Sequence, residues 1–492
     1  MNITTSQSKP LQTAFILLAL GFVAVLLLRI ILVFSYIPET GGVSVNVLFS
    51  IVRMLNGYSL YTDPQLPPYP VVQYMPLHYF IVTGLGKLMS IQNNIHAVSV
   101  LNRLLCLAFD LLVFIPVYKI LSNIFKVNSR QLIAAVCMCI FLILPNSNYA
   151  RIDNLYLLLF ITAIYQMLLF VSKPATDLRK LAITAFIISL AIFTKQSGLF
   201  LLAGTGLYLL IIHREWKATI LFSLTVLICC TSLFFLLSQN NYYEFYQNTV
   251  LGLNNGISLS WFNTVIIKTF FYKMYFFVAA GLALAVLAFK KGTDKTIQLI
   301  GMVSMVVFIC SLLASLKWGS ATNYFTEFLA LSFMLSAIHF TRNSITSSLT
   351  PIFLLCITPL FILSVFNDKG WGHLSGLKKS KQVYAETMQV SNYIQSKLNR
   401  NEYVFTDFHK ENLLNIALNS NSLFPHREIV VHCSYPKKIF SYDDFNTRLQ
   451  SGKLKYWIGK KDDEPSGFLN VHFNKFEKDT VIGGFAVYRL MP

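Results

Sequence analysis

The sequence of residues 36–79 is YIPETGGVSVNVLFSIVRMLNGYSLYTDPQLPPYPVVQYMPLHY, and it separates two long apolar runs. This stretch is longer than an ordinary connection between helices. It holds a lone acid, Glu39, then an amphipathic run over 43–55, then Pro- and Tyr-rich residues. Long loops of such specific composition are usually functional. We therefore expect it to form one wall of an active site at the outer face of a membrane.

The rest of the chain has the composition of a polytopic membrane protein. Its 492 residues have a mean hydropathy of +0.57, and only 13% of them are charged, well below the level in soluble domains. Since a membrane helix needs about 20 apolar residues, the sequence predicts about eleven spans. They cover 11–35, 97–121, 131–146, 154–172, 180–194, 198–212, 217–238, 264–288, 296–315, 323–341 and 350–366. The fifth and sixth are short and adjoin at 195–197, as one interrupted pair would.

The charged residues divide the chain into two parts. Only nine of the 22 acidic residues lie at or before Phe366. Lys and Arg gather in alternate short connections, which the positive-inside rule assigns to the cytoplasm. This predicts a membrane domain over 1–366, with a first outer loop at 36–96, a cytoplasmic N-terminus and an extracytoplasmic domain over 367–492. The net charge of +18 then reflects membrane orientation, and no nucleic-acid partner is expected.

The last quarter of the sequence has the pattern of a small α/β domain. Residues 384–398 have helical spacing, and short β-rich runs separated by polar turns follow. The predicted strands are 403–407, 429–432, 454–458, 471–476 and 485–490.

Three outer turns each carry a basic residue beside small or polar neighbours: Arg151, Lys195 and Lys317. A single lysine at a membrane end commonly does no more than extend its amine to water. Three such turns together favour a phosphate-binding site, because cations neutralise a phosphate and N–H groups at helix ends add donors.

Glu39 is the strongest candidate for a catalytic base. It follows Pro38 at the outer end of the first span and precedes Gly41 and Gly42, where a ligand can approach the backbone closely. The alternative is a surface carboxylate that caps the following helix.

Other acids have simpler interpretations. Asp63 precedes a proline and is typical of a turn. Asp153 follows Arg151 by two residues, and its alternative role is a helix cap with a local ion pair. Asp110 lies in the middle of a span, where the sequence shows no cation at its depth, and we interpret it as a buried structural group. Glu327 lies about one turn beyond Asn323 and faces either the site or a neighbouring helix.

These stretches, taken in order, resemble the GT-C superfamily of polytopic glycosyltransferases that use polyprenyl-phosphate-linked sugars, in its bacterial branch with the aminoarabinose transferases and protein O-mannosyltransferases. After Glu39, the resembling segments are LNGYSLYTDPQLPPY (55–69), YMPLHYF (74–80), ARIDNLYLLL (150–159), FTKQSGLFLLAGTGLYLL (193–210) and GSATNYFTEFLAL (319–331). The resemblance implies that Glu39 is the catalytic carboxylate and that Lys195 contacts the donor phosphate. Two departures are the single Glu39, where most relatives have Asp or an Asp-Glu pair, and TKQSG in place of TKGP.

The resulting hypothesis is an α-helical polytopic membrane protein that transfers a sugar, with inversion, from a polyprenyl-phosphate-linked donor to an acceptor hydroxyl of a glycan, lipid or protein. The reaction would take place at the outer face of a bacterial inner membrane. Lys195, Arg151 and Lys317 would hold the donor phosphate. The substrate pocket would comprise Asp153, Asp63, Tyr61, Tyr74, His78, Asn323, Tyr324 and Glu327.

No metal or other cofactor is indicated, because the histidines show no ligand spacing. Two other classes of protein stay open. A flippase or transporter for a lipid-linked glycan would predict inverted repeats and broken helices. A polysaccharide polymerase or ligase would share the lipid substrates.

Overall fold

The computed structural model describes residues 8–36, 44–127, 150–172, 177–290, 292–342, 371–399, 401–406, 412–423, 439–441, 443–461 and 475–491. Glu39, the predicted spans 131–146 and 350–366, and the predicted strand 429–432 lie outside these residues.

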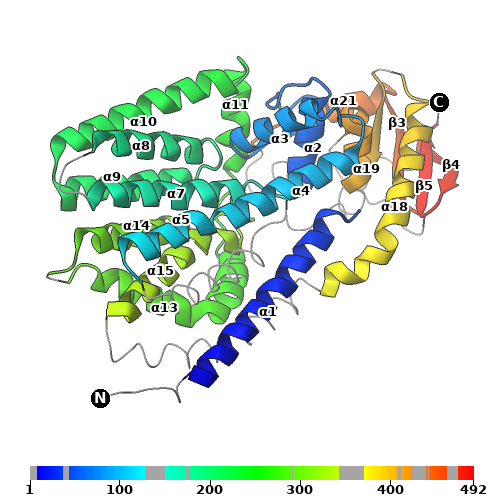
Figure 1. Ribbon diagram of the computed structural model, residues 1–492. Coiled ribbons are helices and arrows are strands. Elements are labelled where there is room, and N and C mark those ends of the chain that lie inside the picture. The colour runs from blue at the N-terminus through cyan, green and yellow to red at the C-terminus, as the bar shows by residue number, and fades with distance from the viewer. Residues whose placement is uncertain are drawn as a thin grey trace.

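Helices make up most of the described chain (Figure 1). In the first half they are α1 (Ser8–Val33), α2 (Ser44–Leu55), α3 (Leu77–Leu88), α4 (Ile95–Leu112), α5 (Phe114–Lys119), η1 (Ile120–Ile124), α7 (Asp153–Val171), α8 (Leu178–Ile192), α9 (Gly198–Tyr208), η2 (Leu209–His213) and α10 (Trp216–Leu237). They continue with α11 (Tyr242–Thr249), η3 (Leu251–Leu253), α12 (Leu259–Trp261), η4 (Phe262–Phe271), α13 (Tyr272–Leu287), α14 (Lys295–Ala314), η5 (Thr322–Phe325), α15 (Thr326–Arg342), α18 (Trp371–Gln395), α19 (Asn412–Leu418), η7 (Asn419–Asn421) and α21 (Asp443–Gln450).

Five helical segments of the described chain are long and apolar enough to cross a membrane: Ile95–Ile124, Asp153–Val171, Trp216–Leu237, Leu259–Leu287 and Lys295–Ala314. Backbone groups in a bilayer must be paired within their own segment, so apolar runs of this length form helices there. Each segment overlaps a predicted span, and the chain is a membrane protein as predicted. The total of about eleven spans stays a prediction.

The predicted interruption between the fifth and sixth spans is present as a tight turn between α8 and α9. α8 ends at Ile192, and α9 begins at Gly198. A Cβ atom at position 198 would lie 2.6 Å from the backbone nitrogen of Ile192, so only glycine fits this close approach. The turn presents Lys195 and Gln196 at one end of the helix bundle.

A buried ion pair joins α1 to α4. Arg29 Nη2 lies 2.8 Å from Asp110 Oδ2, and both side chains are almost fully buried. We expected no cation at the depth of Asp110, and the ion pair with Arg29 shows that this was wrong. The sequence did not indicate the pair, because Arg29 is embedded in an apolar run that indicates only a membrane span. From the same helix as Asp110, Arg103 Nη1 donates to the carbonyl oxygens of Leu32 and Ser35 and so caps the C-terminal end of α1.

The C-terminal part contains a five-stranded sheet in the order β2-β1-β3-β5-β4. Its strands are β1 (Tyr403–Thr406), β2 (Ser422–Leu423), β3 (Leu454–Lys460), β4 (Phe476–Ile482) and β5 (Phe485–Leu490). β1 is parallel to β2 and β3, whereas β5 is antiparallel to β3 and β4. In Figure 1 this sheet and α18 lie at the same end of the bundle as α2, α3 and α11.

The predicted helix at 384–398 and the strands at 403–407, 454–458 and 485–490 match α18, β1, β3 and β5. Most of the strand predicted at 471–476 lies outside the described residues, because these resume only at 475, and there it stays a prediction. The described strand β4 begins at Phe476, lies at one end of the strand order and contains Glu477, Lys478 and Asp479.

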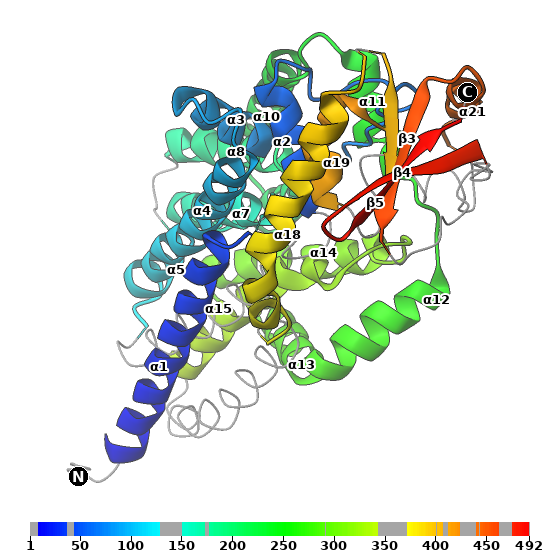
Figure 2. The same cartoon turned by 90° about the vertical axis from the view of Figure 1, so that its right-hand side faces the viewer.

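The two faces of the sheet are covered differently. α18 and α19 cover one face, where Val390 and Leu414 pack on Val404 and Ile458. Figure 2 shows both helices beside the sheet. The opposite face is covered by the first outer loop, whose Tyr69 and Val71 join a core that contains Phe405, Leu423, Phe440, Leu454 and Trp457. Burial of each large apolar side chain contributes about 1.5–3 kcal/mol, so this contact holds the loop firmly on the sheet.

Candidate active site

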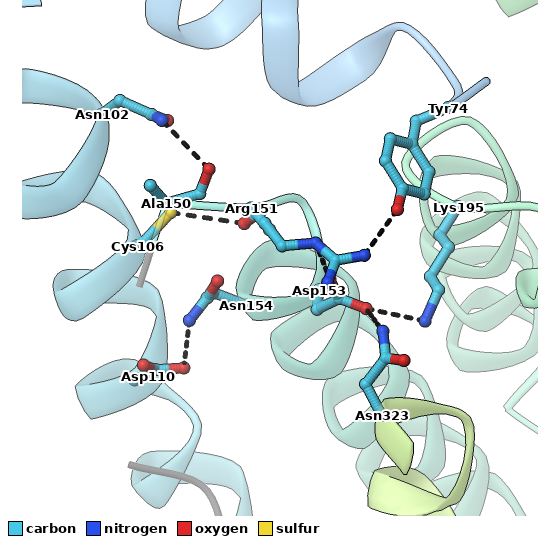
Figure 3. Close-up of polar contacts among 10 residues, drawn as sticks. All are labelled: Tyr74, Asn102, Cys106, Asp110, Ala150, Arg151, Asp153, Asn154, Lys195 and Asn323. Atoms are coloured by element: carbon cyan, nitrogen blue, oxygen red, sulfur yellow. Dashed lines mark hydrogen bonds and ion pairs between the residues drawn. The ribbon is translucent and has the colours of Figure 1, made fainter. Parts of the chain in front are cut away.

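Four polar side chains from separate parts of the chain meet at the start of α7 (Figure 3). Asp153 lies in the first turn of α7, and its Oδ1 accepts from Lys195 Nζ at 2.7 Å and from Asn323 Nδ2 at 2.7 Å. Its Oδ2 lies 3.4 Å from Arg151 Nε. The α8–α9 turn supplies Lys195, and the segment before α15 supplies Asn323. We call Arg151, Asp153, Lys195 and Asn323 the Asp153 cluster.

The Asp153 cluster is buried and rich in positive charge. Lys195 is 4% exposed and Arg151 is 7% exposed, and both cations contact one carboxylate, Asp153. Burial alone would lower the pKa of Lys195, but the Asp153 and Glu327 carboxylates raise it above its usual value. Both basic side chains are therefore charged at neutral pH. A buried charge is tolerated when an opposite charge compensates it. Because the two cations share the Asp153 carboxylate, the cluster is suited to bind a further anion.

Aromatic rings surround the two cations. Arg151 Nη2 donates to the Tyr74 hydroxyl, and the guanidinium lies 5.7 Å from the Tyr74 ring centroid. Lys195 Nζ lies 5.4 Å from the ring centroid of Tyr156 and 5.3 Å from that of Tyr324. These cation–π contacts fix the cations without neutralising them. The hydroxyl of Ser197, two residues after Lys195, is buried without a hydrogen-bond partner in the described chain.

One face of α4 holds the segment that carries Arg151 and Asp153 (Figure 3). Asn102 Nδ2 donates to the carbonyl oxygen of Ala150, Cys106 Sγ donates to the carbonyl oxygen of Arg151, and Asp110 Oδ1 accepts from Asn154 Nδ2. The three α4 residues are spaced four apart and so lie on one helix face. Because Asp110 also binds Arg29, α1 is tied to the same arrangement.

Four of the predicted pocket residues lie in the first outer loop, and the structure places them differently. Tyr74 contacts Arg151 as described above. The Tyr61 hydroxyl donates to the carbonyl oxygen of Tyr74, so it supports the loop next to the cluster. His78 is fully buried behind it, with Nε2 2.9 Å from Asn102 Oδ1, and burial lowers its pKa to about 4. The Asp63 carboxylate accepts from the backbone N–H of Gln65 at 2.9 Å, as the turn interpretation predicts, and no described hydrogen bond or ion pair joins it to the cluster.

The remaining predicted residues lie around the cluster or outside the described chain. Tyr324 contacts Lys195 as described above, and Glu327 is buried about one turn beyond Asn323 on α15. Lys317 lies in the turn after α14, where its backbone bridges Ile257, and it contacts none of the four cluster residues. Glu39 lies outside the described residues, so its distance from the cluster stays a prediction.

Two features of the site were not predicted from the sequence: the contact of Gln196 with the first outer loop, and the face of α4 that holds the segment with Arg151 and Asp153. Gln196 Nε2 donates to the carbonyl oxygen of Gln73 at 2.7 Å, so one turn contacts both the cluster and the first outer loop. A usable signal was present for α4, because Asn102, Cys106 and Asp110 are polar or small groups at i, i+4 and i+8 of an apolar span. Among the described residues, no three His, Cys, Asp or Glu side chains gather as a metal site.

No protein-family model matches the chain, and no curated protein matches it significantly. Solved structures do share its fold. ArnT from Cupriavidus metallidurans in its crystal structure bound to undecaprenyl phosphate has a TM-score of 0.60 at 12% identity, covering 96% of this chain and 97% of ArnT. Apo ArnT has a TM-score of 0.62 with the same identity and coverage.

The oligosaccharyltransferase AglB from Archaeoglobus fulgidus, in complex with an inhibitory peptide and a dolichol-phosphate, is also similar. Its TM-score is 0.55 at 12% identity, covering 91% of this chain and 69% of AglB. ArnT and AglB are both members of the GT-C superfamily of glycosyltransferases. The chain therefore has the GT-C fold, as the resemblance of its motifs predicted.

Proposed function

We propose that this protein is a membrane glycosyltransferase that moves a sugar from a polyprenyl-phosphate-linked donor to an acceptor hydroxyl. The Asp153 cluster carries this proposal, because two buried cations share one carboxylate and can bind a phosphate. The GT-C fold supports it, since ArnT of this fold was crystallised with undecaprenyl phosphate and AglB was solved in complex with a dolichol-phosphate.

In this proposal Arg151 and Lys195 bind the phosphate that links the sugar to its lipid. The acceptor oxygen attacks the anomeric carbon of the sugar from the face opposite the phosphate, and the bond from that carbon to the phosphate oxygen breaks. The configuration inverts, and the lipid phosphate leaves as an anion. Two cations that are already in place stabilise the negative charge that develops on this leaving group, and no solvent has to reorganise.

The acceptor hydroxyl must lose its proton during the attack, and we assign Glu39 as the base. A carboxylate that is partly buried can accept a proton near neutral pH. This assignment derives from the resemblance of the first outer loop to the GT-C family. Tyr74, Tyr324 and Glu327 line the space around the cations in the same proposal and would contact the sugar or the acceptor.

We place the reaction at the outer face of a bacterial inner membrane, with a cytoplasmic N-terminus and a periplasmic C-terminal domain. The basic short connections support this orientation. Reporter fusions after residue 125 and after residue 366 should report opposite sides of the membrane, inside and outside respectively. Two fusions on the same side would contradict the orientation.

Binding of undecaprenyl phosphate by the purified full-length protein tests the role of the cations. Lys195→Ala and Arg151→Ala should each weaken binding about ten- to a hundredfold, because a hydrogen bond to a charged group contributes about 1.5–3 kcal/mol. Lys87→Ala is the matched control, since Lys87 is an exposed lysine in the last turn of α3, in the first outer loop. Equal affinity in Lys195→Ala, Arg151→Ala and the control would contradict the assigned site.

A further inference from the structure

Residues 69–74 of the first outer loop, which we call the strap, contribute side chains to two different hydrophobic cores. Tyr69 and Val71 are buried in the core of the C-terminal sheet. Val72 is buried in the core of the helix bundle, and Tyr74 packs against that core. Neighbouring side chains thus point to different domains. We therefore expect a displacement of the C-terminal sheet to move Val72 and Tyr74 as well.

On the side of the C-terminal domain, Tyr69 is the anchor. Its ring is fully buried, and its hydroxyl donates to Asp444 Oδ2 at 2.8 Å. Arg448 Nε donates to the same Asp444 oxygen at 2.6 Å, which fixes the acceptor on α21. The ring and the hydroxyl of Tyr69 are therefore both held by the C-terminal domain.

On the side of the bundle, polar contacts hold three successive residues of the strap. The Val72 N–H donates to Asn248 Oδ1 at 2.8 Å, and the Gln73 carbonyl accepts from Gln196 Nε2 at 2.7 Å. The last residue, Tyr74, meets Arg151 through its hydroxyl. The sheet of the C-terminal domain is thus linked to a cation of the Asp153 cluster through the six residues of the strap.

We infer that the C-terminal domain is a positioning part of the active site: Tyr69 fixes the strap, and the strap fixes the Tyr74 hydroxyl that orients Arg151. This inference rests on the proposed function of the Asp153 cluster. Tyr69 is a positioning residue, since none of its described contacts reaches the cluster directly. Loss of the Tyr69 anchor should widen the range of Tyr74 positions, and Arg151 should then bind a phosphate less well.

The structure offers a chemically matched control for Tyr69. The hydroxyl of Tyr393, on α18, donates to Asp479 Oδ2 at 2.8 Å, the same type of bond at the same length. Both residues of this second pair belong to the C-terminal domain and lie away from the strap. Tyr69→Phe and Tyr393→Phe each remove one hydroxyl from a Tyr–Asp pair, and only the first affects the strap.

The experiment measures undecaprenyl phosphate affinity of the full-length protein in lipid nanodiscs. Tyr69→Phe should weaken binding by about threefold or more, as expected for coupled residues of one network, whereas Tyr393→Phe should leave it unchanged. The double variant Tyr69→Phe/Tyr74→Phe should bind no more weakly than Tyr74→Phe alone, because Tyr69 acts through Tyr74. Additive losses in the double variant, or equal losses in the Tyr69 and Tyr393 variants, would overturn the inference.

Hydrogen exchange separates this inference from the proposed function. Tyr69→Ala should increase amide exchange in peptides that cover 71–74 and 150–152, with no change in the Tyr393→Phe protein. If the wild-type protein does not bind undecaprenyl phosphate, the proposed function fails, and exchange alone decides whether the strap positions Arg151. Unchanged exchange at 150–152 in a folded Tyr69→Ala protein would refute the positioning role, whether or not the lipid binds.

Discussion

Lys195 Nζ lies 2.7 Å from Asp153 Oδ1, although 42 residues separate them in the chain. The other oxygen of the same carboxylate lies 3.4 Å from Arg151 Nε. Among the described residues, this one carboxylate contacts both buried cations directly, and the cations can still bind a further anion such as a phosphate. A phosphate bound at this cluster should stabilise the protein as well as occupy the site.

Asp153→Asn removes the carboxylate from between the two cations. We expect a loss of stability of about 3–5 kcal/mol, the usual effect of leaving a buried charge without its partner. Undecaprenyl phosphate should then raise the Tm of the variant by more than it raises the Tm of the wild type, because the phosphate replaces part of the missing charge. Thermal unfolding in detergent, with and without the lipid, measures both effects.

Asp63→Asn is the control for this comparison, since the Asp63 carboxylate accepts from the Gln65 N–H in a turn and has no contact with the Asp153 cluster among the described interactions. Its response to the lipid should equal that of the wild type. A lipid-induced shift in Asp153→Asn no larger than in the wild type would mean that the cluster does not bind the phosphate.

The Arg29–Asp110 pair should be coupled in stability. Arg29→Met leaves the buried Asp110 carboxylate without its cation and should destabilise the protein by about 3–5 kcal/mol. The double variant Arg29→Met/Asp110→Leu removes both charges and should be more stable than the sum of the two single effects predicts. Denaturant unfolding of the four proteins gives this coupling energy, and strict additivity would show that the ion pair does not join α1 to α4.

His78 should make the protein sensitive to acid. Its pKa in the folded chain is about 4 instead of 6.5, chiefly because of burial, so the unfolded state binds more protons between these values. The associated stability is fully present above about pH 6.5 and is lost progressively as the pH falls toward 4, a difference of roughly 3 kcal/mol. The Tm of His78→Gln should therefore fall less between pH 7 and pH 4.5 than that of the wild type. Parallel pH profiles for the two proteins would contradict the buried, neutral state of His78.

The sequence predicted the helical segments and the convergence of Arg151 and Lys195 because both leave local signals. Apolar runs mark the spans, and basic residues in outer turns break the charge rule of the membrane. The contact between Lys195 and Asp153 has no such signal, since Asp153 already has a sequence neighbour, Arg151, as a partner. Pairing across 42 residues depends on how α7 and α8 pack, which the sequence pattern does not specify.

Two further features could not be predicted for the same reason. Arg29 lies in an apolar run, and only the packing of α1 on α4 shows that it meets Asp110. Tyr69 and Val71 are part of a Pro- and Tyr-rich loop whose composition indicates irregular structure. Their burial depends on the face of that sheet opposite α18 and α19, where they pack against Phe405, Leu454 and Trp457. Long-range packing determines both outcomes.

In the proposed reaction the Asp153 cluster holds the lipid phosphate while Glu39 takes the proton of the acceptor. The most direct test measures sugar transfer from a polyprenyl-phosphate-linked donor by Glu39→Gln, together with its affinity for undecaprenyl phosphate. Gln keeps the shape of Glu39 but cannot accept a proton near neutral pH. We predict that transfer is abolished while lipid affinity stays within about twofold of the wild type, since Glu39 contributes no cation to the phosphate. Full transfer by Glu39→Gln would contradict the account.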